Sequence, residues 1–389
     1  MKNILKTGLA LNLLMASQIA FGANVIDLQM NTTDLNKYLE KPLAYSFTNS
    51  KISVNGKAWI DIEEMETRGQ SSINAKRRNF GIKLDEKVMI GGIEAKNLNV
   101  LSMWIDKGYV SSKFGLMIVD QLNIGAPLLT EYAELKINGK TNGLYLVVEK
   151  PKSAAGNTPY MVRRGYRSAF KSKEAKISKK ITVQDVKKIE QVRDSIYAAV
   201  VSRSGAELYN ELKQKMDIEG YMKWMVMNSL FRNGDGPDEV FFYVDADMYK
   251  AGSIYFRIMP WDFDDLFKPM HDVSINKAML DKSPDSIIYN FEDKLDNKFA
   301  HDAYLYTQLK AMTRKLLTTE LTQINTNAVL ENIQKEISPY LERNDILDAG
   351  KVDGGRKGLG YSKKEILDII ANRKVEIEKR RTWLLQRSN

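Results

Sequence analysis

The first half of the chain alternates apolar and polar positions with the period of two that is typical of β-strands. Between about residues 43 and 149, short alternating segments are separated by turn residues such as Asn55-Gly56 and Gly91-Gly92. The clearest of these segments are 52–54, 58–62, 80–84, 132–137 and 143–149. The last two predict a β-hairpin that turns through 138–142. Between 111 and 123 the apolar spacing changes and predicts a helix that interrupts the strands.

The second half of the chain repeats apolar residues at intervals of three and four. This spacing is typical of helices that pack on one face, and it begins after Lys150-Pro151. The predicted helices are 183–201, 206–216, 218–231, 299–317, 321–340 and 362–385. A pair of short strands, 240–244 and 253–259, interrupts them and turns through 245–247. A β-rich half followed by a mostly helical half predicts an α+β fold with a ligand cleft between the halves.

The N-terminal residues have the pattern of a secretory signal peptide. Lys2 and Lys6 precede a mostly apolar stretch, 7–21, and Ala20 and Gly22 are small residues placed for a cut after Gly22. The apolar stretch is short for a membrane span, so a cleaved signal is favoured over an uncleaved anchor helix. We therefore predict a signal peptide at 1–22, a β-rich N-terminal lobe at 23–155, and a helical C-terminal lobe with the metal and catalytic loops at 156–389.

This interpretation also sets the compartment and the expected partners. A cleaved signal predicts an exported protein of the periplasm, cell surface or extracellular medium. No later stretch has the roughly 18 consecutive apolar residues of a transmembrane helix, so we expect no stable membrane insertion after cleavage. Residues 160–180 combine many cations with aromatic residues, a pattern that also suits nucleic acid. For an exported protein we favour a substrate-docking or lobe-crossing role and expect no nucleic-acid partner.

Composition narrows the chemistry further. The 389 residues include no cysteine, which excludes thiolate nucleophiles, disulfides, cysteine-bound zinc and iron-sulfur clusters. The two histidines, His271 and His301, are far apart and have no partner at metal-binding spacing. The motifs of an ordinary protein kinase, Gly-x-Gly-x-x-Gly, His-Arg-Asp and Asp-Phe-Gly, do not occur. The remaining candidates for chemistry are carboxylates, lysines and hydroxyls.

The densest group of acids follows the predicted strand that ends at Met259. The sequence Pro-Trp-Asp-Phe-Asp-Asp at 260–265 contains Asp262, Asp264 and Asp265. On extended backbone Asp262 and Asp264 would point to the same side. Two carboxylates on one side suit Mg²⁺ or Mn²⁺ that holds phosphate oxygens. An acidic turn that caps the following segment is the alternative.

A second acidic segment, Asn233-Gly-Asp-Gly-Pro-Asp-Glu at 233–239, lies between a predicted helix and a predicted strand. Loops at the ends of rigid elements often carry catalytic acids. The segment does not fit a calcium-binding loop, because Pro237 occupies a position that needs a ligand side chain. A plain Gly-Pro turn is the alternative.

The segment 68–78 is basic and contains a glycine and two hydroxyls. Its candidate phosphate contacts are Arg68, Ser71, Ser72 and Lys76. Backbone amides, hydroxyls and cations together suit a polyphosphate. A solvated basic loop is the alternative.

Taken in order, these segments resemble the CotH kinase family, the secreted atypical kinases named after a spore coat protein. The matching segments are Arg68-Gly-Gln-Ser-Ser with Lys76, Phe-Gly-Ile-Lys-Leu at 80–84, Ile-Asn-Gly at 137–139, Gly-Leu-Tyr-Leu-Val-Val-Glu at 143–149, Asn-Gly-Asp at 233–235 and Pro-Trp-Asp-Phe-Asp at 260–264. The resemblance implies a divergent protein-kinase-like fold with a β-rich N-terminal lobe and a mostly helical C-terminal lobe. It also implies ATP with Mg²⁺, or Mn²⁺, and transfer of the γ-phosphoryl group to Ser or Thr of an exported protein substrate.

The resemblance further implies roles for individual acids. Asp262 would be the metal-binding aspartate, with Asp264 beside it. Asp235 would orient the acceptor hydroxyl or complete the metal site. The family usually has an asparagine a few residues after Asp235, whereas this chain has Asp238-Glu239. Glu239 is therefore a further candidate metal ligand, and it changes the local charge.

For the nucleotide, the resemblance makes Lys76 the candidate phosphate-binding lysine and Glu149 its carboxylate partner, because a paired lysine is held in one geometry. Arg68, Ser71 and Ser72 belong to the same predicted phosphate-binding segment. Tyr145 and Phe256 are the aromatic residues nominated to enclose adenine.

Two other functions remain open. An inactive CotH-like binding or assembly module would recognise an acidic partner through Arg163, Arg164 and Arg167, and nucleotide would not stabilise it. Nucleotide transfer on the same scaffold would leave a nucleotide adduct rather than a phosphate on the acceptor.

Overall fold

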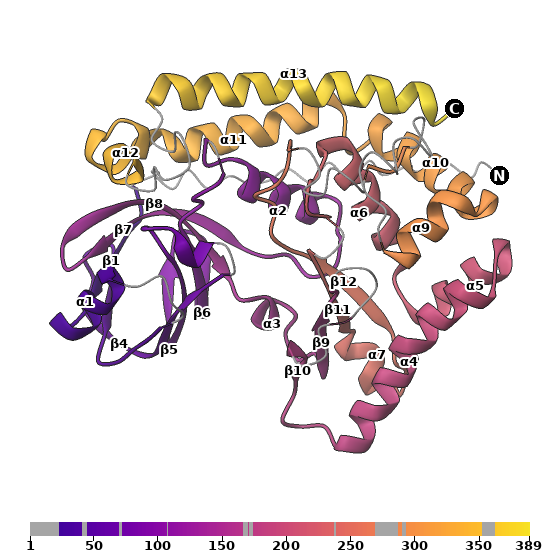
Figure 1. Ribbon diagram of the computed structural model, residues 1–389, viewed down its shortest axis with the longest axis horizontal. Helices are drawn as coiled ribbons and strands as arrows, with labels where there is room; N and C mark the ends of the chain where they lie inside the picture. The colour runs from indigo at the N-terminus through magenta and orange to yellow at the C-terminus, as the bar shows by residue number, and fades with distance from the viewer. Residues whose placement is uncertain are drawn as a thin grey trace, which may run out of the picture.

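The computed structural model describes residues 23–40, 45–69, 72–106, 108–165, 170, 174–236, 239–268, 287–289, 293–351 and 362–389. The predicted signal peptide at 1–22, as well as Ser71, Arg167 and His271, lies outside these residues. The described chain has mixed α+β architecture, with an N-terminal β-barrel followed by a mostly helical region (Figure 1). The predicted order of a β-rich half and a helical half is therefore confirmed.

The barrel is one sheet closed on itself. Its strands are β1 (Val25–Gln29), β2 (Ser46–Phe47), β3 (Lys51–Val54), β4 (Ile60–Arg68), β5 (Asn79–Ile90), β6 (Ile93–Leu101), β7 (Thr130–Ile137) and β8 (Lys140–Glu149). They follow the order β2-β4-β3-β1-β7-β8-β6-β5, and pairing of β4 with β5 closes the sheet. Inward-facing residues such as Leu28, Ile82 and Val147 are fully buried. Alternation along each strand therefore fills the barrel with apolar side chains.

Two local features of the barrel region follow from short-range sequence signals. The β7–β8 turn consists of Asn138 and Gly139, with φ of 52° and 77°, as a tight primed turn requires. The turn is thus shorter than the predicted 138–142. Helix α2 (Ser111–Gln121) lies where the apolar spacing predicted it. The buried Asp106 carboxylate accepts hydrogen bonds from the amides of Ser111 and Ser112 at 3.0 and 2.9 Å, which satisfies the start of the helix.

The helical region contains a second, smaller sheet. Its strands are β9 (Tyr160–Arg163), β10 (Lys176–Ile177), β11 (Val240–Val244) and β12 (Phe256–Pro260), in the order β10-β9-β11-β12. The helices are α1 (Thr32–Glu40) on the barrel, then α3 (Pro151–Ala154), α4 (Val183–Ser202), α5 (Gly205–Lys215), α6 (Ile218–Phe231), α7 (Ala246–Lys250), α9 (Lys294–His301), α10 (Ala303–Thr318), α11 (Gln323–Leu341), α12 (Asn344–Gly350) and α13 (Lys363–Arg387). In the described part of the chain, no helix combines the length and the apolar run needed to cross a membrane.

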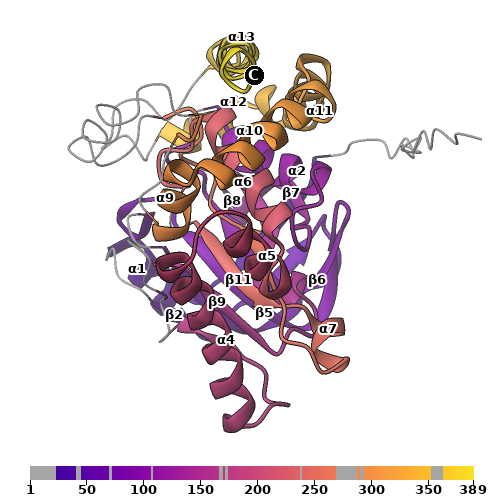
Figure 2. The same cartoon turned by 90° about the vertical axis from the view of Figure 1, so that its right-hand side faces the viewer.

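The two halves share one hydrophobic core. The outer faces of β7 and β8 contribute Tyr132, Leu144 and Leu146 to the same cluster as α2 and the C-terminal helices. Figures 1 and 2 show α13 running along one side of the molecule, above α11 and α10, while α12 sits over the barrel. The last helices therefore fix the position of the barrel relative to the second sheet.

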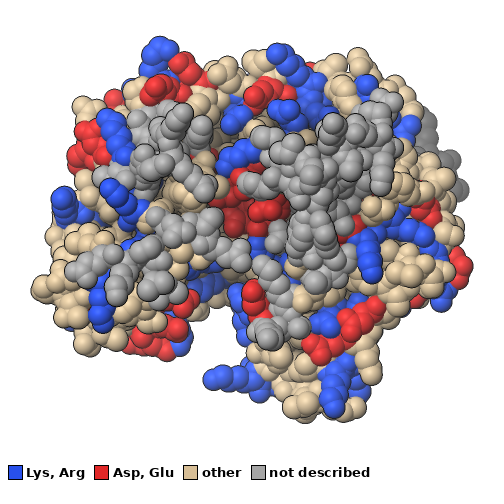
Figure 3. Space-filling view, viewed as in Figure 1, with Lys and Arg blue, Asp and Glu red and all other residues tan. Residues whose placement is uncertain are grey.

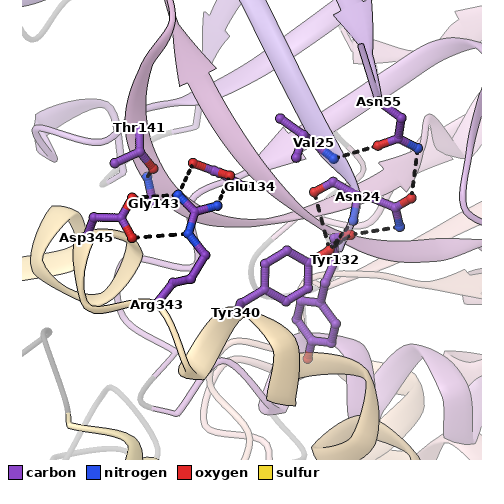
Figure 4. A network of polar contacts seen from close by, with 10 residues as sticks. All are labelled: Asn24, Val25, Asn55, Tyr132, Glu134, Thr141, Gly143, Tyr340, Arg343 and Asp345. Carbon is purple, nitrogen blue, oxygen red and sulfur yellow. Dashed lines mark hydrogen bonds and ion pairs between the residues drawn. The ribbon is translucent and has the colours of Figure 1, made fainter. Parts of the chain in front are cut away.

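Polar contacts between α11–α12 and the barrel tie the two ends of the chain together (Figure 4). The Tyr340 hydroxyl donates to the Tyr132 carbonyl and accepts from the Asn24 amide, both at 2.8 Å. Arg343 donates to both carboxylate oxygens of Glu134 on β7 and also pairs with Asp345. A bidentate arginine pair holds a fixed orientation. These contacts anchor β1 and β7 to the C-terminal helices.

Candidate active site between the barrel and the second sheet

An acidic cavity of about 160 Å³ lies where the start of β5 and the end of β6 meet the loops after α6 and β12. The carboxylates that line it are Asp235, Glu239, Asp262, Asp264 and Asp265. Arg68 from β4 and Arg163 from β9 lie in the same wall. The structure therefore brings Asp235, Asp262 and Asp264 together with a cation from each half of the molecule.

The loop after β12 reaches the cavity through a turn rather than as an extended strand. Asp262 has φ of 54°, in the left-handed region that non-glycine residues seldom adopt. Asp262 and Asp264 do line the same cavity, but not through the strand alternation that was predicted, because β12 ends at Pro260 and residues 264–267 form a turn. Two backbone hydrogen bonds join this turn to the end of α6 and the loop that follows it. The Gly234 amide donates to the Asp265 carbonyl at 3.0 Å, and the Phe267 amide donates to the carbonyl of Phe231, the last residue of α6, at 2.8 Å.

Phe263 anchors the acidic loop in the core. Its ring is 1% exposed and lies against α2 at Gly115. A Cβ atom added at Gly115 would stand 2.3 Å from the Phe263 Cγ, a distance that real contacts do not show. The glycine thus allows Phe263 to pack closely, and Phe263 fixes the two acids that flank it.

Replacing Gly115 by alanine should therefore displace Phe263 and, with it, the acidic loop. The clash should cost about 1–3 kcal/mol of unfolding free energy, which outweighs the gain of about 1 kcal/mol that alanine gives in a helix. Displacement of Phe263 should also reduce any activity that depends on Asp262 and Asp264. Chemical denaturation and the transfer assay described below measure the two effects. The control is Asp120→Ala at an exposed position of the same helix, and equal stability of both variants would contradict this packing argument.

The acids in the cavity repel one another. Burial raises the pKa of Asp264 well above its usual range, and the charges of Asp262 and Asp265 raise it further. Burial also raises the pKa of Asp262, while Arg163 and Arg68 act in the opposite direction. A divalent cation would relieve this repulsion, and its preferred ligands are carboxylate oxygens. The donor set therefore fits Mg²⁺ or Mn²⁺ chemically.

The fit does not extend to a preformed metal cage. Within the described ranges, no three acidic or histidine side chains have the spacing of a complete ligand set. Mg²⁺ is usually held by one or two carboxylates together with water and substrate phosphates. The residues present match that mode of binding, in which the phosphates bring part of the ligand set.

Arg163 joins the acidic cavity to a neighbouring basic cleft. Its guanidinium pairs with Glu239 in the acidic cavity, and both side chains are largely buried. The Arg68 guanidinium lies 5.5 Å from the centre of the Trp261 ring. Arg68, Arg163 and Trp261 line both the acidic cavity and the cleft. The two spaces are therefore adjacent, and these three side chains lie between them.

The basic cleft has a volume of about 780 Å³ and lies between β4 and β6 of the barrel, α3, and strands β9–β11. Its cations are Arg68, Lys150, Lys152, Arg163 and Lys176, and its acids are Glu66 and Glu174. Burial lowers the pKa values of Lys150 and Lys176, and the charge of Arg68 lowers both further. Crowded cations of this kind favour a polyanionic ligand. Figure 3 shows basic side chains around a notch between the halves, with acidic side chains gathered nearby.

Only some of the residues predicted to bind the nucleotide line the acidic cavity. Arg68 and Ser72 line the acidic cavity, where the Ser72 hydroxyl accepts a hydrogen bond from the Asn79 side chain at 3.0 Å. Lys76 is exposed, and in the described part of the chain no ion pair joins it to Glu149. Glu149 lies opposite Leu98 on β6, and burial raises its pKa.

The two aromatic nominations for adenine lie in the core. Tyr145 is fully buried in the barrel beneath the Arg77 guanidinium, and Phe256 is fully buried near α6. Neither ring lines the cavity or the cleft. Phe241 on β11 and Trp261 do line the cleft. Sequence reasoning missed Phe241 because its neighbour Phe242 has the same character, and only the strand register decides which ring faces outward.

Arg164 corrects the interpretation of the basic segment. This side chain is fully buried and lies 3.5 Å from Asp293 and 3.2 Å from Asp296. It is therefore a structural cation, unable to bind an external acidic partner. Of the three arginines named for that role, Arg163 lines the cleft and Arg167 lies outside the described residues.

A cavity lined by carboxylates beside a cationic cleft is an arrangement suited to phosphoryl transfer. Comparison with known proteins agrees: the sequence pattern described as CotH kinase protein matches residues 65–387. The chain belongs to the CotH kinase family, a membership that suggests an atypical kinase using ATP. It is also 24% identical over 221 residues to inner spore coat protein H of Bacillus subtilis (strain 168), a match that spans 53% of this chain and 58% of that relative.

Proposed function

We propose that the protein is an exported protein kinase that transfers the γ-phosphoryl group of ATP to Ser or Thr of an exported protein, with Mg²⁺ or Mn²⁺. The observation that supports this proposal is that the acidic cavity and the basic cleft are adjacent, with Arg68, Arg163 and Trp261 lining both. Phosphoryl transfer requires chiefly positioning and neutralisation of charge. In this proposal the barrel and the helical region are the two lobes of a divergent kinase-like fold.

The proposal assigns different ends of the nucleotide to the two spaces. The cleft is large enough for a nucleoside, and Phe241 and Trp261, which lie under Lys176 and Arg68, are the aromatic residues that line it. Arg68 and Arg163 lie at the junction, where they would bind phosphate oxygens through paired N–H donors. This replaces Tyr145 and Phe256 as the base contacts and gives Arg68 and Arg163 a more direct role than Lys76.

The acids take the remaining roles. Asp262 and Asp264 would hold the metal, with water and the substrate phosphates supplying its other ligands. A bound Mg²⁺ supplies positive charge to the oxygens of the transferred group. Asp235, on the neighbouring loop, would orient the acceptor hydroxyl and accept its hydrogen bond. Glu239 adds a negative charge where the family usually has an asparagine, and its ion pair with Arg163 neutralises that charge.

Phosphotransfer from γ-labelled ATP tests this function. The purified chain should label itself or a co-exported protein with Mg²⁺ or Mn²⁺, and Asp235→Ala should abolish labelling while the variant stays folded. Asp120→Ala, at an exposed position of α2, is the matched acid control. Mass spectrometry of the acceptor separates a phosphate from a nucleotide adduct. Labelling that persists in Asp235→Ala would remove this residue from the mechanism.

The alternative, an inactive binding module, predicts different behaviour. Saturating ATP with Mg²⁺ should raise the unfolding temperature of a nucleotide-binding protein, because a ligand that binds only the folded state stabilises it by about 2.7 kcal/mol at a hundredfold excess over its Kd. Arg68→Gln should reduce this shift. No shift with any metal, together with loss of an acidic partner in Lys152→Glu, would favour the module. Lys152 replaces Arg164 in this test because Arg164 is buried.

A further inference from the structure

A row of residues crosses the outer face of the barrel inside the basic cleft. Glu66 on β4 lies opposite Gly81 on β5, and Gly81 lies opposite Asn99 on β6 (Figure 1). Residues directly opposite one another point to the same face of a sheet, and their neighbours Ile82 and Leu98 fill the barrel on the other face. The side chains of Glu66 and Asn99 both line the cleft. The row therefore forms part of the cleft wall.

Gly81 allows a carboxylate and an ammonium group to meet over the middle of this row. A Cβ atom added at Gly81 would stand 3.3 Å from the Glu66 Oε1 and 3.5 Å from the Lys150 Nζ. The backbone amide of Lys150 donates to the Asn97 carbonyl at 3.1 Å, which fixes Lys150 beside the end of β6. Lys150 also lines the cleft. An acceptor and a donor thus face the cleft side by side.

Asn99 contributes a further donor to the same wall. Its side chain is 2% exposed, and among the residues that the structure describes no acceptor pairs with its Nδ2. A buried donor without an acceptor costs free energy, and folded proteins contain few of them. Because Asn99 lines the cleft, a ligand bound there can supply the missing acceptor.

These three side chains favour a pair of hydroxyls over a phosphate at this position. Glu66 would repel an anionic oxygen, whereas a hydroxyl donates to a carboxylate and accepts from an ammonium or amide group. Arg68 lies two residues after Glu66 on the same strand face, about 7 Å further along β4. It lines both the cleft and the acidic cavity. The hydroxyls would therefore belong to a group that lies one step away from the phosphates.

We propose that Glu66, Asn99 and Lys150 bind the two ribose hydroxyls of the nucleotide. This inference rests on the proposed function, in which the cleft holds the nucleoside of ATP. The Glu66 carboxylate accepts a hydrogen bond from one hydroxyl, while the Asn99 Nδ2 and the Lys150 Nζ donate to the hydroxyl oxygens. The site makes the protein selective for ribonucleotides, because a deoxy analogue leaves buried or charged groups without a partner.

Calorimetric titration of the purified full chain with ADP, 2′-deoxy-ADP and 3′-deoxy-ADP in the presence of Mg²⁺ tests the site. ADP is the probe because it binds without phosphoryl transfer. The unmodified chain should bind ADP about tenfold or more tightly than either analogue. Glu66→Ala and Asn99→Val should each weaken ADP binding about tenfold and leave the affinities for the analogues nearly unchanged, because each variant removes one partner of a hydroxyl.

Two controls separate a direct contact from a structural effect. Glu64→Ala removes the same charge at an exposed position of β4, two residues before Glu66, and should keep the preference for ADP. Asn99→Val should not lower the unfolding temperature of the nucleotide-free chain, because the described residues offer its Nδ2 no acceptor to lose. A merely structural role of Asn99 would lower that temperature.

The possible outcomes distinguish this site from the function on which it rests. Equal affinity of the unmodified chain for ADP and both analogues would overturn the ribose site and leave nucleotide binding intact. Failure to bind any nucleotide with Mg²⁺ or Mn²⁺ would remove the proposed function together with the site. If Glu64→Ala loses the preference for ADP to the same extent as Glu66→Ala, the charge of the strand produces it, and the contact assigned to Glu66 is wrong.

Discussion

Asp262→Asn should lower the rate of phosphotransfer by about 10²- to 10³-fold or more, comparable with the loss of one preorganised charge-stabilising group. The same substitution should raise the free energy of unfolding in metal-free buffer. The stability gain arises because burial disfavours the charged form of Asp262 and repulsion by Asp265 adds to this effect, although Arg163 and Arg68 oppose it. Removal of one charge should add roughly 1 kcal/mol of unfolding free energy, or about 2 °C in Tm. A functional acid that destabilises its own fold is typical of an active site.

Asparagine is the informative substitution at this position. Asp262 adopts φ of 54°, and asparagine tolerates this conformation as well as aspartate does. Alanine would add about 1 kcal/mol or more of backbone strain and would hide the gain from removing a buried charge. Asp262→Asn therefore changes charge and leaves the backbone unchanged.

Thermal unfolding with and without Mg²⁺ and ATP, followed by the transfer assay, measures both effects. The unmodified chain should gain stability from Mg²⁺ with ATP, and Asp262→Asn should lose most of that gain. Asp120→Asn serves as the control because this acid is exposed on α2. Full activity in Asp262→Asn would show that the cavity is not the site of transfer. Lost activity with a lower Tm would point to unfolding instead.

Local sequence signals were sufficient for most of the helical region. The predicted helices 183–201, 206–216 and 218–231 correspond to α4, α5 and α6 within a few residues. Each has its own apolar periodicity, and α4 also has a capping box at Thr182 and Asp185. These signals act within one turn or two, so they can be read without knowledge of the fold.

Closure of the barrel depends on distant pairings that the sequence pattern does not reveal. β1, at Val25–Gln29, was not predicted as a strand, yet it pairs in parallel with β7 more than a hundred residues later. β4 and β5 are separated by the basic segment and still close the sheet. Alternation predicts which face of a strand is buried but does not specify its partner.

The difference between local sequence signals and distant strand pairing also explains which residues of the candidate site could be predicted. The acids Asp235 and Asp262 were found from short motifs, because each motif follows the end of a helix or strand. The ring and lysine assignments depended on three-dimensional register. β8 is buried on both faces, so nothing in its sequence distinguishes Tyr145 in the barrel from residues on the outer face. Lys150 and Lys176, which line the cleft, belong to no motif.

Arg164→Met should strongly destabilise the fold, although Arg164 lies outside the acidic cavity. Arg164 is fully buried, stacks 5.0 Å from the Trp224 ring, and donates to Asp296 and to the Tyr221 hydroxyl. Methionine would leave Asp293 and Asp296 buried without a cation, which costs about 3–5 kcal/mol. Urea denaturation followed by circular dichroism measures the loss.

The unfolding free energy lost in Arg164→Met should depend on pH, and the protonation of the buried Asp296 determines whether this loss grows or shrinks as pH rises. Burial raises the pKa of Asp296 to about 7, above the unfolded value of 3.8, although Arg164 opposes the shift. A group with a raised folded pKa stabilises the protein when protonated, and this contribution is lost as pH rises through about 7. Without Arg164 the pKa of Asp296 should rise further. The difference in unfolding free energy between the two proteins should therefore be larger at pH 8 than at pH 5.

Arg203→Met provides the comparison, because Arg203 also pairs with two acids but lies at the surface, with its side chain 43% exposed. Solvent screens exposed pairs, so this change should cost less than about 1 kcal/mol, with little dependence on pH. If Arg164→Met costs no more than Arg203→Met, the buried network does not hold α9 against β9 and α6. If its cost falls rather than grows between pH 5 and pH 8, Asp296 is ionised throughout that range, and the proton assigned to it belongs to another group.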